Sequence, residues 1–154
     1  TTLFRSLDKR IQGQNDSVLC REGIEQAEKW GEILKGACDW DKIITSGLSR
    51  ARQTASIVNK VLELPVEWDS RLNEQDWGKW NGLTDRELLG DKAGELNRRL
   101  SLGWRFRPPG GENRVSVWKR SSRALSELAG RSPGENVLVI AHGVVIKCLL
   151  YGLI

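Results

Sequence analysis

The 154-residue chain contains no methionine, one histidine, one tyrosine, two phenylalanines and three cysteines. A single histidine excludes a metal centre built on several imidazoles. The cysteines, Cys20, Cys38 and Cys148, are widely spaced, odd in number and without a CxxC pair. This pattern argues against a disulfide framework or a zinc site and favours a reducing compartment. We therefore expect a cytoplasmic protein that uses no metal or other cofactor.

Long apolar runs and one-sided charge are also missing. No stretch approaches the roughly 18 apolar residues that span a bilayer, and no signal peptide is visible, so we expect no membrane contact. The net charge is only +4, and its densest basic cluster has five arginines between Arg98 and Arg114. No helix-turn-helix, zinc-finger or RNP pattern accompanies them, so we expect no nucleic-acid partner. A basic rim that attracts small anionic substrates explains the cluster equally well.

Alternating apolar patterns indicate the fold. The length suits one domain over 1–154, and no repeat or linker divides it. Strand patterns occur at 1–4, 41–46, 66–69 and 136–141; helical patterns occur at 21–36, 48–64, 84–100, 114–130 and 143–154. This alternation predicts a mainly parallel sheet covered by helices, which is an α/β fold.

Two polar segments follow predicted strands and would share one edge of that sheet. They are "TSGLSR" after "DKII" and "AHG" after "NVLVI". Ligands of parallel α/β folds bind beyond the carboxyl ends of the strands, so we expect these segments to meet in one pocket. Arg50 offers a guanidinium to a phosphate at a helix start, where free backbone N–H groups also favour an anion. His142 adds an imidazole beside Gly143, a residue that lets a ligand approach the backbone.

Glu74 is the third candidate, because a carboxyl group near the aromatic rings of the following Trp/Gly-rich loop can have a raised pKa and donate a proton. Each residue also has an ordinary role: a solvated arginine, a histidine sealing a strand end, or an exposed loop glutamate. Together, a cation, an imidazole and an acid suit phosphoryl chemistry. Cys148 is expected to pack in the core, and no second histidine could activate a cysteine nucleophile.

The order of five segments resembles the histidine phosphatase superfamily, the phosphoglycerate mutase-like enzymes. The segments are "RIQGQNDSVLCREGIEQAEKWGEIL", "TSGLSRARQTASIV", "LNEQDWGKWNGLT", "RPPGGEN" and "VLVIAHGVVIK". The fourth is similar to the connection found in the phosphatase branch of that family. Five motifs in the same order are far more specific than any one of them.

The resemblance implies a three-layer α/β/α sandwich with a central, mainly parallel sheet. It places His142 beside the transferred phosphoryl group, Arg50 as the second phosphate-binding arginine and Glu74 as the proton donor. It also implies that substrate contacts come from Arg5 or Arg10, Gln12, Gly13 and Gly143. The small substrate would be a phosphorylated metabolite, and the exposed tryptophans or sheet edges could support a homodimer.

One departure from the family pattern is large. The family's nucleophile is the histidine of an N-terminal Arg-His-Gly motif, whereas this chain runs from "TTLF" through "RSLDK" to "RIQGQ". The chain also ends at "YGLI", where the family continues. Three explanations are open: the motif lies outside these residues, a deletion leaves a phosphate-binding pseudoenzyme, or the activity is a different one. We expect the first, because losing part of a central strand would destabilise the fold and because methionine is absent even at position 1.

The sequence therefore predicts a phosphatase that hydrolyses small phosphate monoesters through a phosphohistidine intermediate. The alternatives are phosphoryl transfer of the phosphoglycerate mutase type and a non-catalytic phosphate-binding protein.

Overall fold

The computed structural model of the chain describes residues 10–90 and 92–152, so the predicted strand at 1–4 and the candidate Arg5 lie outside the described residues. Six α-helices and three strands follow one another in those ranges, with three short 3-10 helices between them. They are α1 (Arg21–Lys35), β1 (Lys42–Thr45), α2 (Ser49–Leu62), β2 (Val66–Trp68), α3 (Asp85–Leu89), α4 (Ala93–Leu100), α5 (Arg114–Arg131), β3 (Val137–Ile140) and α6 (Gly143–Tyr151).

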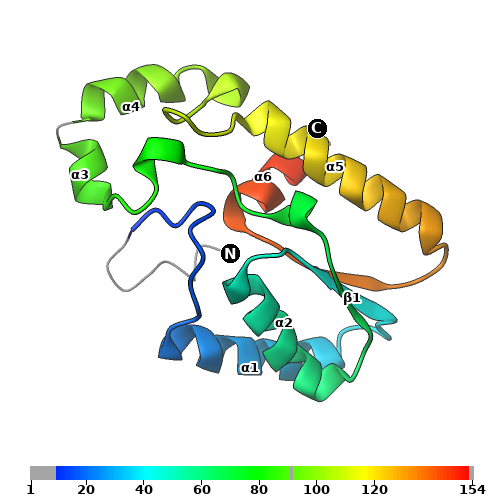
Figure 1. The fold of residues 1–154 in the computed structure, drawn as a ribbon. Coiled ribbons are helices and arrows are strands. Elements are labelled where there is room, and N and C mark those ends of the chain that lie inside the picture. Colours follow the sequence, from blue (N-terminus) through cyan, green and yellow to red (C-terminus); the bar gives the residue numbers. More distant parts are fainter. Residues whose placement is uncertain (1–9, 91, 153–154) are drawn as a thin grey trace.

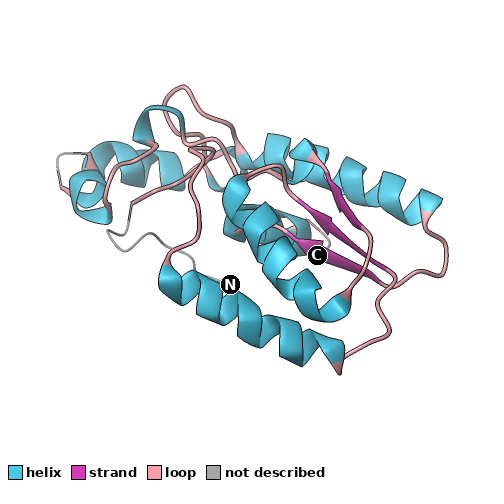
Figure 2. Cartoon of the chain, turned by 60° about the horizontal axis from the view of Figure 1, so that its bottom comes forward, coloured by secondary structure: helices cyan, strands magenta, loops and turns pink. Residues whose placement is uncertain are grey.

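The three described strands form one parallel sheet in the order β2-β1-β3. Thr45 of β1 lies opposite Trp68 on one side and Ile140 on the other, so all three strands end at the same edge. Helices α1 and α2 cover one face of the sheet, and α5 and α6 cover the other (Figures 1 and 2). The predicted α/β sandwich with a parallel sheet is confirmed.

Small residues let the helices pack closely on one face. Helix α1 buries Ala27 and Gly31 against α2, and a Cβ at Gly31 would lie 3.4 Å from the Val58 carbonyl oxygen. The middle strand β1 buries Ile43 and Ile44 completely or nearly so. Burial of such aliphatic side chains contributes about 1.5–3 kcal/mol each, which anchors the sheet that carries the site.

The helix-prone stretch 84–100 is two helices rather than one. Thr84 and Glu87 form a capping box that starts α3, with the Glu87 N–H donating to the Thr84 hydroxyl oxygen. Gly90 then leaves helical geometry at ψ −105°, and α4 begins at Ala93. The low helix propensity of glycine gives the physical reason for the break.

These two helices belong to a separate small core beside the sheet. Trp80, Leu88, Leu96 and Phe106 are buried together there, with Trp77 packed against them. We call residues 77–90 and 92–106 the cap, which Figure 1 shows to one side of the sandwich. Across the described ranges, no helix combines the length and apolar character needed to cross a membrane.

Candidate active site

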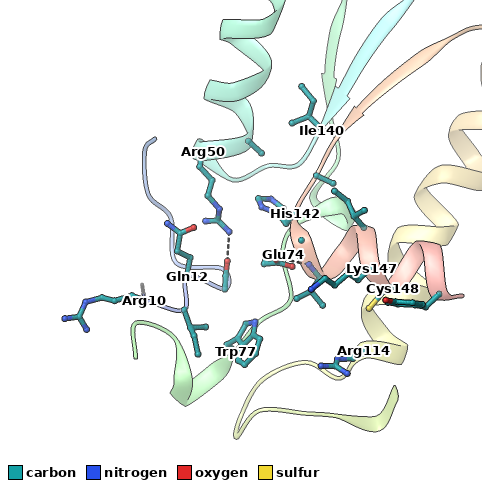
Figure 3. Close-up of a pocket in the computed structure, with 18 of the residues that line it drawn as sticks. Arg10, Gln12, Arg50, Glu74, Trp77, Arg114, Ile140, His142, Lys147 and Cys148 are labelled. Carbon is teal, nitrogen blue, oxygen red and sulfur yellow. Dashed lines mark hydrogen bonds between the residues drawn. The ribbon is translucent and has the colours of Figure 1, made fainter. Parts of the chain in front are cut away.

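A cavity of about 820 Å³ opens at the carboxyl ends of β1 and β3, bounded by α6 and by the cap (Figure 3). Arg50, Glu74 and His142 all line it. Arg50 stands in the first turn of α2, His142 directly precedes α6, and Glu74 comes from the loop between β2 and the cap. The structure thus shows the predicted meeting of the two segments that follow β1 and β3 in one pocket, and Glu74 lines the same pocket.

Arg50 is held in place by the backbone of the 12–17 loop. Its Nη1 donates to the Asn15 carbonyl at 3.0 Å and its Nη2 donates to the Gly13 carbonyl at 2.7 Å. The side chain is buried, and this burial lowers its pKa while the charges of Glu74 and Asp16 oppose the shift. A guanidinium remains charged under such conditions, so the site has a fixed cation aimed by two hydrogen bonds.

Gly13 can present its carbonyl to Arg50 because it is a glycine. Its φ is +51°, in the left-handed region, and a Cβ there would collide with the Asn81 side chain. Gly13 therefore lines the cavity and also orients the arginine.

The start of α2 differs from the expectation of free amides. The Asp16 carboxylate accepts from the Ser49 N–H at 2.7 Å and from the Ser49 hydroxyl at 2.6 Å. These bonds, the Ser49 hydroxyl first, lower the pKa of Asp16. The chain's own carboxylate thus occupies the first amide of the helix.

His142 is a buried imidazole held against the end of β1. Its Nε2 lies 2.6 Å from the Ser46 hydroxyl oxygen, and that oxygen also accepts from the Leu48 N–H at 3.3 Å. Burial first, and then the charges of Arg50 and Arg120, lower the His142 pKa to about 3. The imidazole is therefore neutral at neutral pH, and an anion bound beside it would raise its pKa.

The carboxyl group of Glu74 lies beside the first turn of α6. Its Oε1 accepts from the Gln75 N–H at 2.8 Å and its Oε2 accepts from the Val144 N–H at 3.3 Å. Burial raises the pKa of this carboxyl group, although both N–H groups and the charge of Arg50 act in the opposite direction. A carboxyl group with a raised pKa can hold a proton for transfer, and the role of proton donor stays a prediction for Glu74.

Two side chains hold the backbone carbonyl of Glu74 in place. This carbonyl accepts from Arg120 Nη2 at 3.1 Å and from Gln14 Nε2 at 3.0 Å. Arg120 also forms a two-pronged ion pair with Glu112, at 2.8 and 2.9 Å. This guanidinium thereby ties α5 to the loop that carries the acid.

The other substrate-binding candidates differ in how their side chains lie relative to the cavity. Gln12 and Gly143 line the cavity, and the Gln12 side-chain amide donates to the Ser17 hydroxyl at 3.2 Å. Arg10 also borders the cavity, but its guanidinium donates to the Gly82 carbonyl and points away from Arg50 in Figure 3.

Several residues at the site were not anticipated: one that is paired with His142 and three that line the cavity. Ser46 belongs to the quoted "TSGLSR" segment, but its pairing with His142 depends on contact between two strand ends. Trp77, Trp104 and Arg114 belong to segments whose sequence suggested packing or a general basic rim. No group of three or more His, Cys, Asp or Glu side chains within 10–90 and 92–152 is arranged to hold a metal ion.

Comparison with known proteins gives a consistent match. The model of the histidine phosphatase superfamily (branch 1) matches residues 3–154. A Salmonella choleraesuis protein named "Probable phosphoglycerate mutase GpmB" is 31% identical over 143 residues, which cover 93% of this chain and 66% of the relative. The chain thus spans slightly less than two thirds of the length of such relatives.

Solved structures agree in fold. The mycobacterial glucosyl-3-phosphoglycerate phosphatase solved with VO3 is 34% identical, with a TM-score of 0.86 over 96% of this chain and 74% of that chain. The alpha-ribazole phosphatase from Shigella flexneri is 29% identical, with a TM-score of 0.80 over 96% and 73% of the two chains. From the family match and the shared fold, we conclude that this chain belongs to the histidine phosphatase superfamily.

Proposed function

We propose that the protein is a phosphatase that hydrolyses small phosphate monoesters through a phosphohistidine intermediate. The observation that carries the proposal is the meeting of Arg50, His142 and Glu74 at one end of a single cavity. A fixed cation, an imidazole and a carboxyl group with a raised pKa suit phosphoryl transfer, which depends on positioning and on stabilisation of negative charge.

The nucleophile is proposed to be a histidine outside these 154 residues, in the Arg-His-Gly motif of the family. His142 is the sole histidine of the chain, and its segment resembles the family's second-histidine motif. In the first step, the nucleophilic nitrogen bonds to phosphorus and the bond to the leaving oxygen breaks. Glu74 gives its proton to that oxygen, and Arg50 and His142 stabilise the negative charge on the phosphoryl oxygens.

The second step reverses the role of Glu74. As a carboxylate it removes a proton from a water molecule, whose oxygen bonds to phosphorus while the bond to histidine breaks. Inorganic phosphate and the free histidine remain. The raised pKa of Glu74 supports this cycle, because a stronger acid would already have lost its proton before the first step.

Phosphoryl transfer between two hydroxyl groups is the second candidate, favoured by the mutase name of the curated relatives. The "RPPGGEN" segment, which resembles the phosphatase branch, favours hydrolysis. Incubation with 3-phosphoglycerate separates the two activities, because a phosphatase releases inorganic phosphate and a mutase forms 2-phosphoglycerate.

The decisive experiment uses the full-length protein. Hydrolysis of p-nitrophenyl phosphate should fall by about 10²-fold or more in His142→Ala. Unchanged hydrolysis in that variant would overturn the role of His142. A native protein whose intact mass equals the 17.3 kDa of these 154 residues would overturn the enzyme proposal itself, since it would lack a nucleophile.

A further inference from the structure

The cavity extends beyond the phosphate end to the cap. The space beyond Arg50 and His142 is bounded by apolar side chains of the cap, namely Trp77, Leu88, Leu96, Leu100 and Trp104. This part of the cavity therefore has a different chemistry from the end that holds the catalytic candidates.

Three of the five wall residues, Trp77, Leu88 and Leu96, belong to the packed core of the cap. The Trp77 ring meets Phe106 edge-on, with the ring centroids 5.5 Å apart. Leu88 and Leu96 are buried in the same core. Leu100 and Trp104, by contrast, keep 41% and 39% of their surface exposed. A flat apolar group lying against the wall would cover this surface and release the water that contacts it.

The charges around the cavity are strongly one-sided. Its described lining residues include four basic side chains and one carboxyl group, that of Glu74. Arg50 belongs to the phosphate end, and Arg10 points away, which leaves Arg114 and Lys147. Figure 3 shows both on the far side of Glu74 from Arg10.

Neither of these two cations has an acidic partner among the described residues. The Arg114 guanidinium lies 4.6 Å from the centroid of the Phe106 ring and makes one long hydrogen bond, 3.4 Å, to the Gly103 carbonyl. Lys147 is exposed on α6 and forms no ion pair there. A guanidinium fixed over a ring can accept a planar carboxylate through two N–H groups.

We propose that the substrate is a phosphate monoester whose leaving group is a flat, ring-bearing body with a carboxylate. The ring lies against the cap wall, and the carboxylate binds Arg114 with help from Lys147. This inference rests on the proposed function for one point, the binding of the phosphate between Arg50 and His142.

Phosphonates test the inference without catalysis, because their P–C bond is not hydrolysed. Titration calorimetry on the full-length protein would compare inorganic phosphate, phenylphosphonate and (4-carboxyphenyl)phosphonate. Phenylphosphonate should bind about tenfold more tightly than phosphate, because the ring is removed from water. The carboxyl group should strengthen binding about tenfold again.

Two variants assign the gains to the residues named. Trp104→Ala should lose most of the gain from the ring, and Arg114→Gln should lose the gain from the carboxylate while keeping that from the ring. Trp30→Ala, on the exposed surface of α1, and Arg105→Gln, an exposed neighbour outside the cavity lining, are the matched controls.

Equal affinity for all three probes would overturn the inference and leave the phosphate site intact. A gain from the ring without one from the carboxylate would overturn the role of Arg114, as would an equal loss in Arg105→Gln. If none of the probes binds, the phosphate site fails, and both the proposed function and the inference fall with it.

Discussion

The two ends of the cavity are built in opposite ways. At the phosphate end, Arg50, Glu74 and His142 are each fixed by hydrogen bonds to backbone groups or to a buried hydroxyl. At the cap end, Trp104 is partly exposed and Arg114 has no acidic partner among the described residues. The phosphate end holds its charged side chains in fixed positions, which suits one reaction. The cap end leaves apolar surface and a guanidinium that a ligand can contact.

Replacing Arg50 should cause the largest loss of activity, and it should affect the phosphate end alone. Lysine cannot keep both bonds to the Gly13 and Asn15 carbonyls, so Arg50→Lys should lower kcat/KM for p-nitrophenyl phosphate by about 10³-fold. Steady-state kinetics of the full-length protein would measure this loss. The exposed Arg52→Lys, on the same helix, is the control and should keep full activity.

The comparison of the two ends also predicts what Arg50→Lys leaves intact. The ratio of phenylphosphonate to phosphate affinity should persist in this variant, because the ring contacts the cap. Loss of that ratio would show that the two ends act as one site.

Replacing Glu74 should have the next largest effect, and it should depend on the leaving group. Glu74→Gln removes the proton donor of the first step, so kcat/KM for an alkyl phosphate should fall by about 10²-fold. The kcat/KM for p-nitrophenyl phosphate, which reports the same first step and not the later attack of water, should fall far less, because nitrophenolate leaves without a proton. A series of phosphate esters with graded leaving-group pKa would measure this, and equal losses along the series would remove Glu74 from the role of acid.

Arg120 should matter less, because it acts on Glu74 through the backbone. Arg120→Lys cannot keep the two-pronged pair with Glu112 together with the bond to the Glu74 carbonyl. We expect about a tenfold loss with alkyl phosphates and little change with p-nitrophenyl phosphate. The matched control is Arg123→Lys, which is exposed on the same helix. A uniform loss across leaving groups would indicate a general effect on packing instead.

The sequence predicted the phosphate end far better than the cap end, and the reason is physical. Strand ends and helix starts near Arg50 and His142 carry clear local patterns, and parallel strands bring their carboxyl ends together. The blocking of α2 by Asp16 depends on a contact across 33 residues, which no local pattern reveals. The cap wall likewise depends on tertiary packing, which brings Trp77 and Leu96 together. The helical pattern over 84–100 also did not show that the helix is interrupted at Gly90.

The last effect concerns stability and not activity, and the single histidine of the chain makes it measurable. The folded-state pKa of His142 is about 3, well below its usual value of 6.5. Between pH 6.5 and pH 3, the His142 imidazole is protonated in the unfolded chain and stays neutral in the folded chain. This contribution to stability is therefore complete above pH 6.5 and is lost as the pH falls. At pH 5 the loss should be on the order of 2 kcal/mol.

His142→Gln does not titrate, so its unfolding free energy should fall less between pH 7 and pH 5 than that of the unchanged protein. Urea unfolding at the two pH values would give the difference, in which the opposing titration of Glu74 largely cancels. Arg114→Gln, at the cap end, should retain the slope of the unchanged protein. If His142→Gln retains it as well, the imidazole is not held neutral by burial, and the phosphate end is less enclosed than the bond to Ser46 indicates.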